Sequence, residues 1–322
     1  MKALVYHRYG GIKQLQLEEV EKPVPADNEV LIKVVAAGLN PWDVDKLLGR
    51  PLLVRMGGIF RPTHKILGAD VSGVVEAVGA NVQEFKVGDS VYGDLSEGQW
   101  GAFSEYVCAG KKQLRKKPEF LSHQEAAALP QAGVMALQAL TEKLEVDEQT
   151  KVLFNGAGGG VGSIGIQIAK SMGAEVTAVD RTEKFSFLSE IGADDLIDYR
   201  IDDFTKSGEK YDLIIDVVFN RSSVSALRSL TPNGRYLIVG GKIGLLFRVM
   251  LTSLLLRLFT KKRINLLIHR PNCNLEQLEE LFERGEFQLK IHNTYSLKEA
   301  HKGFMELRAG SVKGKVVVVM PD

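Results

Sequence analysis

A glycine-rich turn between a strand and a helix constrains this sequence more than any other feature. Residues 151–170 read KVLFNGAGGGVGSIGIQIAK, in which an apolar strand runs into glycines and a helix follows. Glycines allow the backbone to approach a pyrophosphate, to which a helix N-terminus offers N–H groups and a positive dipole end. The turn predicts a dinucleotide site in an α/β domain, formed by Ala157, Gly158, Gly159, Gly160, Val161 and Gly162.

An acidic residue follows the turn at the spacing of the dinucleotide-binding motif. Asp180 ends the next apolar strand, about 20 residues after the turn. The alternative to a dinucleotide site is a glycine-rich turn that is needed only for close packing of the helix on the sheet. A carboxylate there can bind the ribose hydroxyls of NAD and repel the 2′-phosphate of NADP, so Asp180 alone favours NAD(H). Arg181 and Lys184 are close in sequence and could hold that phosphate, which leaves both NAD(H) and NADP(H) open.

Strands and helices alternate through the middle of the chain. Near-continuous apolar strands separated by helices indicate a parallel sheet covered on both faces. The predicted strands are Lys151–Asn155, Glu175–Asp180, Leu213–Val218 and Arg235–Val239, with a weaker candidate at Asp195–Tyr199. Because the carboxyl ends of such strands meet the cofactor, the predicted site also includes Val218, Phe219, Gly240 and Gly241.

The first part of the chain has a different sequence pattern, which indicates strands rather than alternating strands and helices. Short apolar runs such as Val30–Ala36 and Val71–Val78 are punctuated by glycine, which is typical of a twisted, barrel-like antiparallel domain. A last strand at Lys315–Met320 has no helix after it and could rejoin this domain. We therefore expect one domain at 1–121 with 290–322 and a second at 122–289.

The sequence pattern changes from short strands to alternating helices and strands near Ser122. Ser122–Glu125 has the spacing of a capping box, which predicts the start of a helix. We expect this helix to break at Pro130 and a second to run from Gly133 to Leu144.

Charge and cysteine content exclude several classes of function. The formal net charge of 322 residues is +1, which gives no global electrostatic reason to bind nucleic acid or acidic membranes. The two cysteines, Cys108 and Cys273, are too few for a disulfide framework and are expected to be reduced. The N-terminal residues lack the apolar core of a signal peptide. These features favour a cytoplasmic location.

The segment 245–259, LLFRVMLTSLLLRLF, is the most apolar run after the turn. At about 15 residues it is shorter than the roughly 20 that a membrane-spanning helix needs. It could bury against the protein or a partner subunit. It could also lie on a membrane surface, helped by the basic residues 261–263, so peripheral membrane contact stays open.

Several patches together resemble the medium-chain dehydrogenase/reductase superfamily, and more closely its zinc-less quinone oxidoreductase and enone reductase branch. The patches span the chain in order: GLNPWD at 38–43, LGADVSGVV at 67–75, VGDSVYG at 87–93, GAFSEYV at 101–107, AAALPQAGVMALQAL at 126–140, the glycine turn, IGADDLIDY at 191–199 and GKVVVV at 314–319. The resemblance implies a GroES-like β-barrel catalytic domain, a Rossmann doubly wound domain and an active site between them.

The sequence departs from the zinc enzymes of that superfamily. Those relatives have a Cys at the place of Asn40, a His beside the acid at Ala69-Asp70, and a further Cys or Asp near Gln131 and Ala132, none of which is present here. It also lacks their four-cysteine lobe. A zinc site needs three or four correctly spaced ligands, so we expect no zinc. Without a Lewis acid, simple alcohol oxidation is disfavoured relative to reduction of an already polarised acceptor.

The resemblance also implies roles for individual residues. Asn40 would lie near the nicotinamide and the substrate carbonyl, although it could be only a turn residue before a proline. Asp43 could take part in a proton relay or be a surface charge. Tyr199 would pack near the adenosine end of the cofactor, unless it is an ordinary core aromatic. Related reductases often have a Lys or His near the place of Asp45, so the Asp there argues against direct proton donation by this segment. Met135 stands where relatives commonly have a Thr that contacts the nicotinamide.

Three functions remain in view at this point. The first is zinc-independent, NAD(P)H-dependent reduction of a small hydrophobic quinone or α,β-unsaturated carbonyl. The second is oxidoreduction of other alcohols or carbonyls by the same fold. The third is a dinucleotide-binding protein with a regulatory or structural role, which could act at a membrane surface. By resemblance we also expect a homodimer, paired through a strand near the sheet edge at Arg235–Val239.

Overall fold

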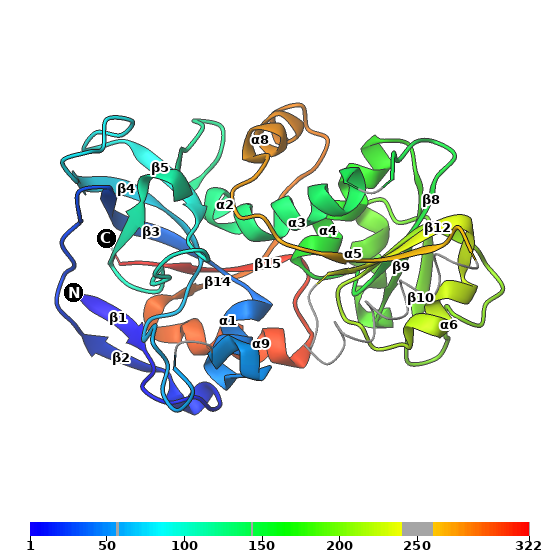
Figure 1. Ribbon diagram of the computed structural model, residues 1–322, viewed down its shortest axis with the longest axis horizontal. Helices are drawn as coiled ribbons and strands as arrows, with labels where there is room; N and C mark the ends of the chain where they lie inside the picture. The colour runs from blue at the N-terminus through cyan, green and yellow to red at the C-terminus, as the bar shows by residue number, and fades with distance from the viewer. Residues whose placement is uncertain (56–57, 143, 240–259, 322) are drawn as a thin grey trace. The chain divides into compact units, whose positions relative to one another are not determined.

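The computed structural model describes residues 1–55, 58–142, 144–239 and 260–321. The chain forms two compact units, the first comprising Met1–Gln131, Pro271–Leu275 and Ile291–Asp322, and the second Ala132–Arg270 and Glu276–Lys290. The chain therefore builds the first unit, passes into the second and returns to the first (Figure 1).

The first unit is built on a large sheet whose strand order is β14-β15-β3-β4-β5-β7, with β6 also paired to β3, beside a separate β1-β2 pair. Its strands are β1 (Lys2–Val5), β2 (Gln16–Glu19), β3 (Glu29–Leu39), β4 (Asp70–Val78), β5 (Ser90–Asp94), β6 (Tyr106–Gly110), β7 (Arg115–Lys116), β14 (Ile291–Ser296) and β15 (Lys315–Val319). Its helices are α1 (Pro41–Leu48), α2 (His123–Ala128) and α9 (Ala300–Ala309), with short 3-10 turns at Ile12–Gln14, Leu52–Arg55, Lys111–Gln113 and Leu297–Glu299.

The predicted strands of this unit are confirmed. Val30–Ala36 lies within β3, Val71–Val78 lies within β4, and the two strands pair antiparallel. The last strand, β15, pairs antiparallel with β3, so the end of the chain rejoins the large sheet of the first unit. The buried faces of these strands share one hydrophobic core with α9.

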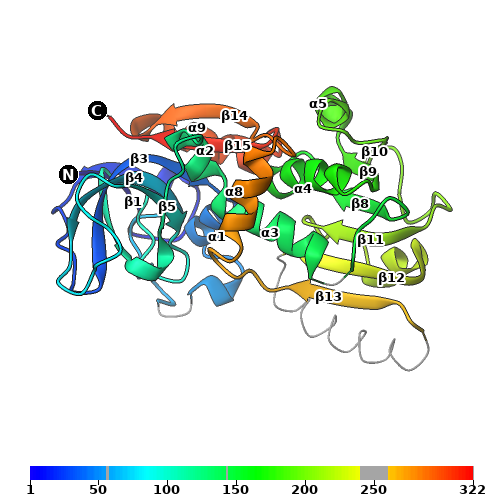
Figure 2. The same cartoon turned by 90° about the horizontal axis from the view of Figure 1, so that it is seen from above.

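The second unit contains a six-stranded sheet in the order β10-β9-β8-β11-β12-β13, in which every neighbouring pair is parallel. The strands are β8 (Lys151–Asn155), β9 (Glu175–Asp180), β10 (Asp195–Asp198), β11 (Tyr211–Asp216), β12 (Leu230–Val239) and β13 (Arg263–Leu267). The helices are α3 (Pro130–Thr141), α4 (Gly160–Ser171), α5 (Phe185–Glu190), α6 (Ser223–Arg228) and α8 (Leu275–Glu283), with a 3-10 turn, η4, at Thr182–Lys184. Figure 2 shows the strands of this sheet side by side with α4 along β8 and β9.

The α/β fold class is as predicted, because this strand order and parallel pairing are those of the doubly wound dinucleotide-binding fold. The capping box is also confirmed: Ser122 Oγ accepts the Glu125 N–H, and Glu125 Oε2 accepts the Ser122 N–H. The predicted helix start at Gly133 is wrong, since α3 begins at Pro130. Proline fits the first helical position because the N–H that it lacks has no intrahelical acceptor there.

Among the residues that the structure describes, no helix combines the length and apolarity needed to cross a membrane. The apolar segment 245–259 and the predicted cofactor residues Gly240 and Gly241 lie outside the described residues.

Candidate functional site

The glycine turn connects β8 to α4 and begins with a residue that the sequence analysis omitted. Gly156 follows β8 directly and has a φ of +87°, in the region that favours glycine. A Cβ placed on Gly156 would lie 2.5 Å from Val218 Cγ2 and 2.6 Å from Val217 Cγ2. The turn after β8 therefore packs against the turn after β11, the neighbouring strand. A glycine directly after an apolar strand was the signal that could have identified it.

The remaining glycines of the turn differ in what surrounds them. A Cβ on Gly162 would collide with the main-chain carbonyl of Ala157, so this glycine allows the first turn of α4 to pack on the loop. Among the described residues, a Cβ on Gly159, the N-cap of α4, would have a single neighbouring atom within 4 Å, Gly156 O at 3.8 Å. The space at the Cβ position is thus open at Gly159, whereas at Gly162 it is filled by the loop. Gly160 and Val161 form the start of α4, whose first N–H groups have no intrahelical acceptor.

Asp180 ends β9 and is buried beside this turn. Its Oδ2 accepts the Gly158 N–H at 2.8 Å, and its Oδ1 accepts the Arg181 N–H at 2.9 Å. Lys184 Nζ also donates to Oδ2 at 3.3 Å. A Cβ on Gly158 would collide with Lys184 Cδ and lie 2.9 Å from Asp180 Oδ2, so a side chain there would displace this ion pair. The carboxylate therefore holds the turn, and its charge is balanced by a buried ammonium.

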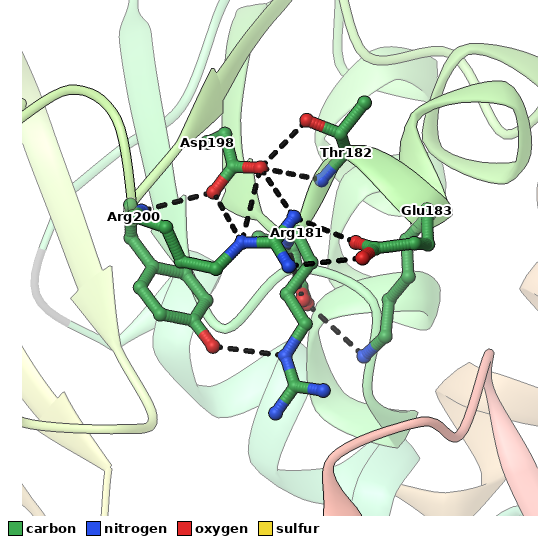
Figure 3. A network of polar contacts seen from close by, with 8 residues as sticks. Arg181, Thr182, Glu183, Asp198 and Arg200 are labelled. Atoms are coloured by element: carbon green, nitrogen blue, oxygen red, sulfur yellow. Dashed lines mark hydrogen bonds and ion pairs between the residues drawn. The ribbon is translucent and has the colours of Figure 1, made fainter.

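Arg181 and Tyr199 lie next to this pair. Arg181 Nε donates to Tyr199 Oη at 2.9 Å, which anchors the guanidinium by one edge. Within the described part of the chain, the two Nη atoms of Arg181 have no hydrogen bond, and Figure 3 shows them pointing away from the network. Two parallel N–H donors on one edge are the arrangement that binds a phosphate or carboxylate in bidentate fashion.

The second arginine of this region is fully engaged. Arg200 binds both oxygens of Glu183, at 2.9 and 2.8 Å, and both oxygens of Asp198 (Figure 3). Asp198 also accepts the Thr182 N–H at 2.9 Å, and these donors, with Arg200 first, hold the pKa of Asp198 well below its usual range. The network fixes the segment after β9 and occupies the guanidinium of Arg200 with carboxylates.

The turn after β11 is organised by a buried acid that the sequence analysis did not single out. Asp216 Oδ1 accepts the N–H groups of Val218 and Phe219 and the Asn155 side-chain amide, and Oδ2 accepts the Tyr236 hydroxyl at 2.6 Å. Phe219 has a φ of 52° and stacks on Tyr236. The acid thus shapes the predicted cofactor residues Val218 and Phe219. An Asp at the carboxyl end of an apolar strand was its sequence signal.

Asn40 and Asp43 lie in the first unit, at the start of α1. Both are buried, and Asp43 is completely inaccessible. Asp43 Oδ2 accepts the Asn40 N–H at 2.8 Å, and Oδ1 accepts the Gly68 N–H at 2.9 Å. Burial raises the pKa of Asp43 to about 7, although both N–H donors act in the opposite direction. Asp43 is not the surface charge that the sequence left open.

The side chain of Asn40 is held between two groups of opposite charge. Its Oδ1 accepts a hydrogen bond from Lys315 Nζ at 2.5 Å, and its Nδ2 donates to Asp70 Oδ2 at 2.9 Å. Asp70 Oδ1 accepts the Gln131 N–H at 3.1 Å. Burial raises the pKa of Asp70 to about 6, while the nearby Lys315 lowers it. Sequence reasoning did not identify Lys315 as a site residue.

The described residues contain no group of three or more His, Cys, Asp or Glu side chains that could hold a metal ion. Cys108 and Cys273 are both free thiols, and burial raises the pKa of Cys108 to about 11.

Comparison with known proteins places this geometry in a family. The model "Alcohol dehydrogenase GroES-like domain" matches residues 26–119, and "Zinc-binding dehydrogenase" matches residues 191–318. The chain is 32% identical over 332 residues to a chloroplast envelope quinone oxidoreductase homolog of Arabidopsis thaliana, covering 99% of this chain and 98% of that protein. It is 37% identical over 227 residues to an NADPH-dependent alkenal/one oxidoreductase of the same plant, covering 68% of this chain and 57% of that protein.

A solved structure agrees with these relatives. The quinone oxidoreductase from Coxiella burnetii superimposes with a TM-score of 0.89 and 30% sequence identity, covering 100% of this chain and 99% of that chain. The similarity spans both units and the residues that build the turn. The chain therefore belongs to the medium-chain dehydrogenase/reductase superfamily, in its quinone oxidoreductase and enone reductase branch.

Proposed function

We propose that this protein is a zinc-independent reductase that uses NADPH to reduce a quinone or an α,β-unsaturated carbonyl compound. The assignment of NADPH as the cofactor rests on one observation, which is the difference between the contacts of Asp180 and those of Arg181. The Asp180 carboxylate accepts two main-chain N–H groups and the Lys184 ammonium, whereas the Nη edge of Arg181 is left for a ligand.

The residues present fit a dinucleotide. The open backbone at Gly159 and the first N–H groups of α4 would receive the pyrophosphate, because among the described residues the nearest atom to a Cβ placed on Gly159 is 3.8 Å away. Val218 and Phe219 would line the neighbouring strand end. For Gly240 and Gly241 the same role stays a prediction from the sequence.

Arg181 and Lys184 support NADPH over NADH. A free carboxylate at the end of β9 would favour the ribose hydroxyls of NAD, but the Asp180 charge here is balanced by an ammonium 3.3 Å away. The Nη groups of Arg181 supply the bidentate donors that a 2′-phosphate needs, with Tyr199 holding the guanidinium in place. The relative named an NADPH-dependent alkenal/one oxidoreductase agrees with this preference.

The acceptor class is supported by the relatives and by the first unit. When bound, the nicotinamide supplies a hydride for a two-electron reduction. By resemblance, Asn40 would orient the acceptor carbonyl. A side-chain amide has two N–H groups, and among the described residues Asp70 takes one from Asn40, which leaves one for a carbonyl oxygen. A proton relay through Asp43 stays a prediction, since its contacts here are main-chain N–H groups.

Direct binding tests the cofactor assignment without an acceptor. We expect NADPH to bind at least ten times more tightly than NADH, because charge-assisted hydrogen bonds contribute about 1.5–3 kcal/mol each. The quenching of tryptophan fluorescence, or the enhancement of nicotinamide fluorescence, gives both dissociation constants. Tighter binding of NADH would refute the role of Arg181, and binding of neither would refute the dinucleotide site.

The assembly and location belong to the same proposal. We propose a homodimer paired through β13, which is one of the two edge strands of the second unit's sheet among the described strands. The predicted strand Arg235–Val239 lies within β12, which is the neighbour of β13. Ile268, directly after β13, is 73% exposed. A cytoplasmic location stays a prediction, which cell fractionation tests.

A further inference from the structure

Four polar side chains meet inside the first unit. Asn40, Asp43, Asp70 and Lys315 are 3%, 0%, 0% and 4% exposed. They come from segments far apart in the sequence, which the sheet brings together: Val316 pairs with Leu39, and Asp70 pairs with Gly38. A buried charge is costly unless it is paired and hydrogen-bonded, so this arrangement is maintained against a free-energy penalty.

Lys315 determines how the Asn40 amide is oriented. An ammonium can only donate hydrogen bonds, and an ionised carboxylate can only accept them. Lys315 Nζ is 2.5 Å from Asn40 Oδ1, and Asp70 Oδ2 is 2.9 Å from Asn40 Nδ2, so only one of the two amide orientations satisfies both neighbours. The main chain of Asn40 is fixed separately, by Asp43.

Lys315 also balances the charge of the acid that completes this arrangement. Its Nζ lies 3.5 Å from Asp70 Oδ2, the same oxygen that accepts from Asn40. Without the ammonium, Asp70 would either be a buried charge without a counter-charge or take up a proton. A protonated Asp70 would no longer require the nitrogen of the Asn40 amide to face it. Loss of Lys315 therefore removes the constraint on Asn40 Oδ1 and weakens the constraint on Asn40 Nδ2.

We propose that Lys315 is a positioning residue for the reaction, acting through Asn40 by holding its amide in the single orientation that presents an N–H to the acceptor. This inference rests on the proposed function, in which Asn40 orients the acceptor carbonyl. It assigns to β15, the last strand of the chain, a part in catalysis.

The test is a double-mutant cycle with Lys315→Met and Asn40→Ala. Lys315→Met lowers kcat about tenfold or more in the wild-type background and leaves the dissociation constant for NADPH unchanged, because the cofactor contacts of the second unit are intact. In the Asn40→Ala background the same change lowers kcat less than about threefold, since residues that act through one another are not additive. Equal losses in the two backgrounds, or an unchanged kcat in Lys315→Met, would overturn the proposal.

Matched variants separate charge from packing. Lys116→Met removes a lysine from the same sheet, where it pairs with Asp89 at the surface, and leaves kcat unchanged. Lys315→Arg keeps the charge and donors and recovers part of the lost kcat. Should Lys315→Met not fold, as judged by circular dichroism, the cycle is run with Lys315→Gln, which is polar and uncharged.

The pH profile gives a readout that packing alone would not change. The charged and titratable groups that face Asp70 are Lys315, Asp43 and Asp94, and those that face Asp43 also include Tyr6 and Lys46. Lys315 favours the ionised form of Asp70. Removal of Lys315 therefore shifts the acidic limb of the kcat–pH profile to higher pH. Lys315→Arg keeps the limb near its wild-type position. A limb that does not move in Lys315→Met would contradict the proposal.

A measurement without turnover distinguishes this inference from the proposed function. Selective ¹⁵N labelling of asparagine allows the side-chain amide of Asn40 to be followed by NMR, with assignment from the Asn40→Asp variant. In the wild type it gives one pair of sharp, shifted signals, and in Lys315→Met these move toward solvent-exposed values or broaden. If no acceptor is reduced but these signals respond, the proposed function fails and the positioning stands. If turnover occurs but the signals are unchanged, the positioning fails.

Discussion

Lys184 Nζ lies 3.3 Å from Asp180 Oδ2, and both side chains are only 8% exposed. The same carboxylate oxygen accepts the Gly158 N–H, so one buried ion pair connects the end of β9 to the glycine turn. Asp180, the last residue of β9, therefore holds the glycine turn in place. In our proposal, recognition of the ribose end of the cofactor then belongs to the neighbouring Arg181.

Arg181→Ala should change the preference between cofactors. Its Nη groups are the donors that we assign to a 2′-phosphate, and loss of charge-assisted hydrogen bonds of about 1.5–3 kcal/mol weakens binding roughly ten- to hundredfold. The KM for NADPH should rise by that factor, and the KM for NADH should change less than about threefold. Tyr199→Phe, which removes only the anchor at Nε, should have a smaller effect in the same direction. Equal losses with both cofactors would contradict the assignment.

Two glycine substitutions in one turn should have opposite consequences. Gly162→Ala should lower the melting temperature with or without cofactor, because its Cβ collides with the Ala157 carbonyl. Gly159→Ala should leave the melting temperature of the free protein within about 2 °C but weaken NADPH binding at least tenfold, because its Cβ enters space meant for phosphate. Thermal unfolding and a binding titration check both. Unchanged affinity in Gly159→Ala would show that the pyrophosphate lies elsewhere.

Asp43 should make stability fall as the pH rises through neutrality. Its pKa is about 7 in the folded protein and about 3.9 in an unfolded chain, so the native state binds more protons between these values. The stability it contributes is complete below about pH 4 and is lost as the pH rises through about 7. Asp43→Asn should therefore flatten the dependence of the unfolding free energy on pH between 5 and 7, although it destabilises the protein overall. Urea unfolding at four pH values measures this, and parallel curves for the two proteins would rule it out.

The proposed dimer should depend on the edge strand β13. Ile268→Lys places a charge beside that edge and should shift the protein to monomers at micromolar concentration in sedimentation velocity. Val224→Lys is the matched control, because Val224 is also exposed, at 57%, but lies on α6. A wild-type protein that sediments as a monomer would remove the dimer proposal.

The fold could be predicted because its signals are local. An apolar strand, a glycine turn and a helix at 151–171 can form only a few structures, and Ser122–Glu125 encodes its own cap. The break at Pro130 was predicted correctly, since α2 ends at Ala128 and α3 begins at Pro130. The second helix was predicted to start later, at Gly133, because a residue that interrupts one helix also suits the first position of the next. Tertiary packing, which a sequence pattern does not show, decides where the helix after such a proline begins.

The candidate site was harder to predict than the fold, because several of its residues interact with side chains that lie far away in the sequence. Gly158 through Gly162 and Asp180 were identified from spacing, but the pairing of Asp180 with Lys184 depends on burial of both. Lys315 is 275 residues from Asn40 and reaches it only because β15 pairs with β3. A lysine ahead of a valine run reads simply as the start of a strand. Asp216 was missed for the same reason, since its role depends on Tyr236 of the adjacent strand.

The most direct test of the central claim is oxidation of NADPH, followed by absorbance, with a simple quinone and a simple enone as acceptors, each with and without a strong metal chelator. NADH is measured in parallel. The account predicts turnover of at least one acceptor with NADPH, faster than with NADH and unchanged by the chelator. Turnover abolished by the chelator would contradict zinc independence, and binding of NADPH without reduction of any acceptor over a wide panel would contradict the reductase function itself.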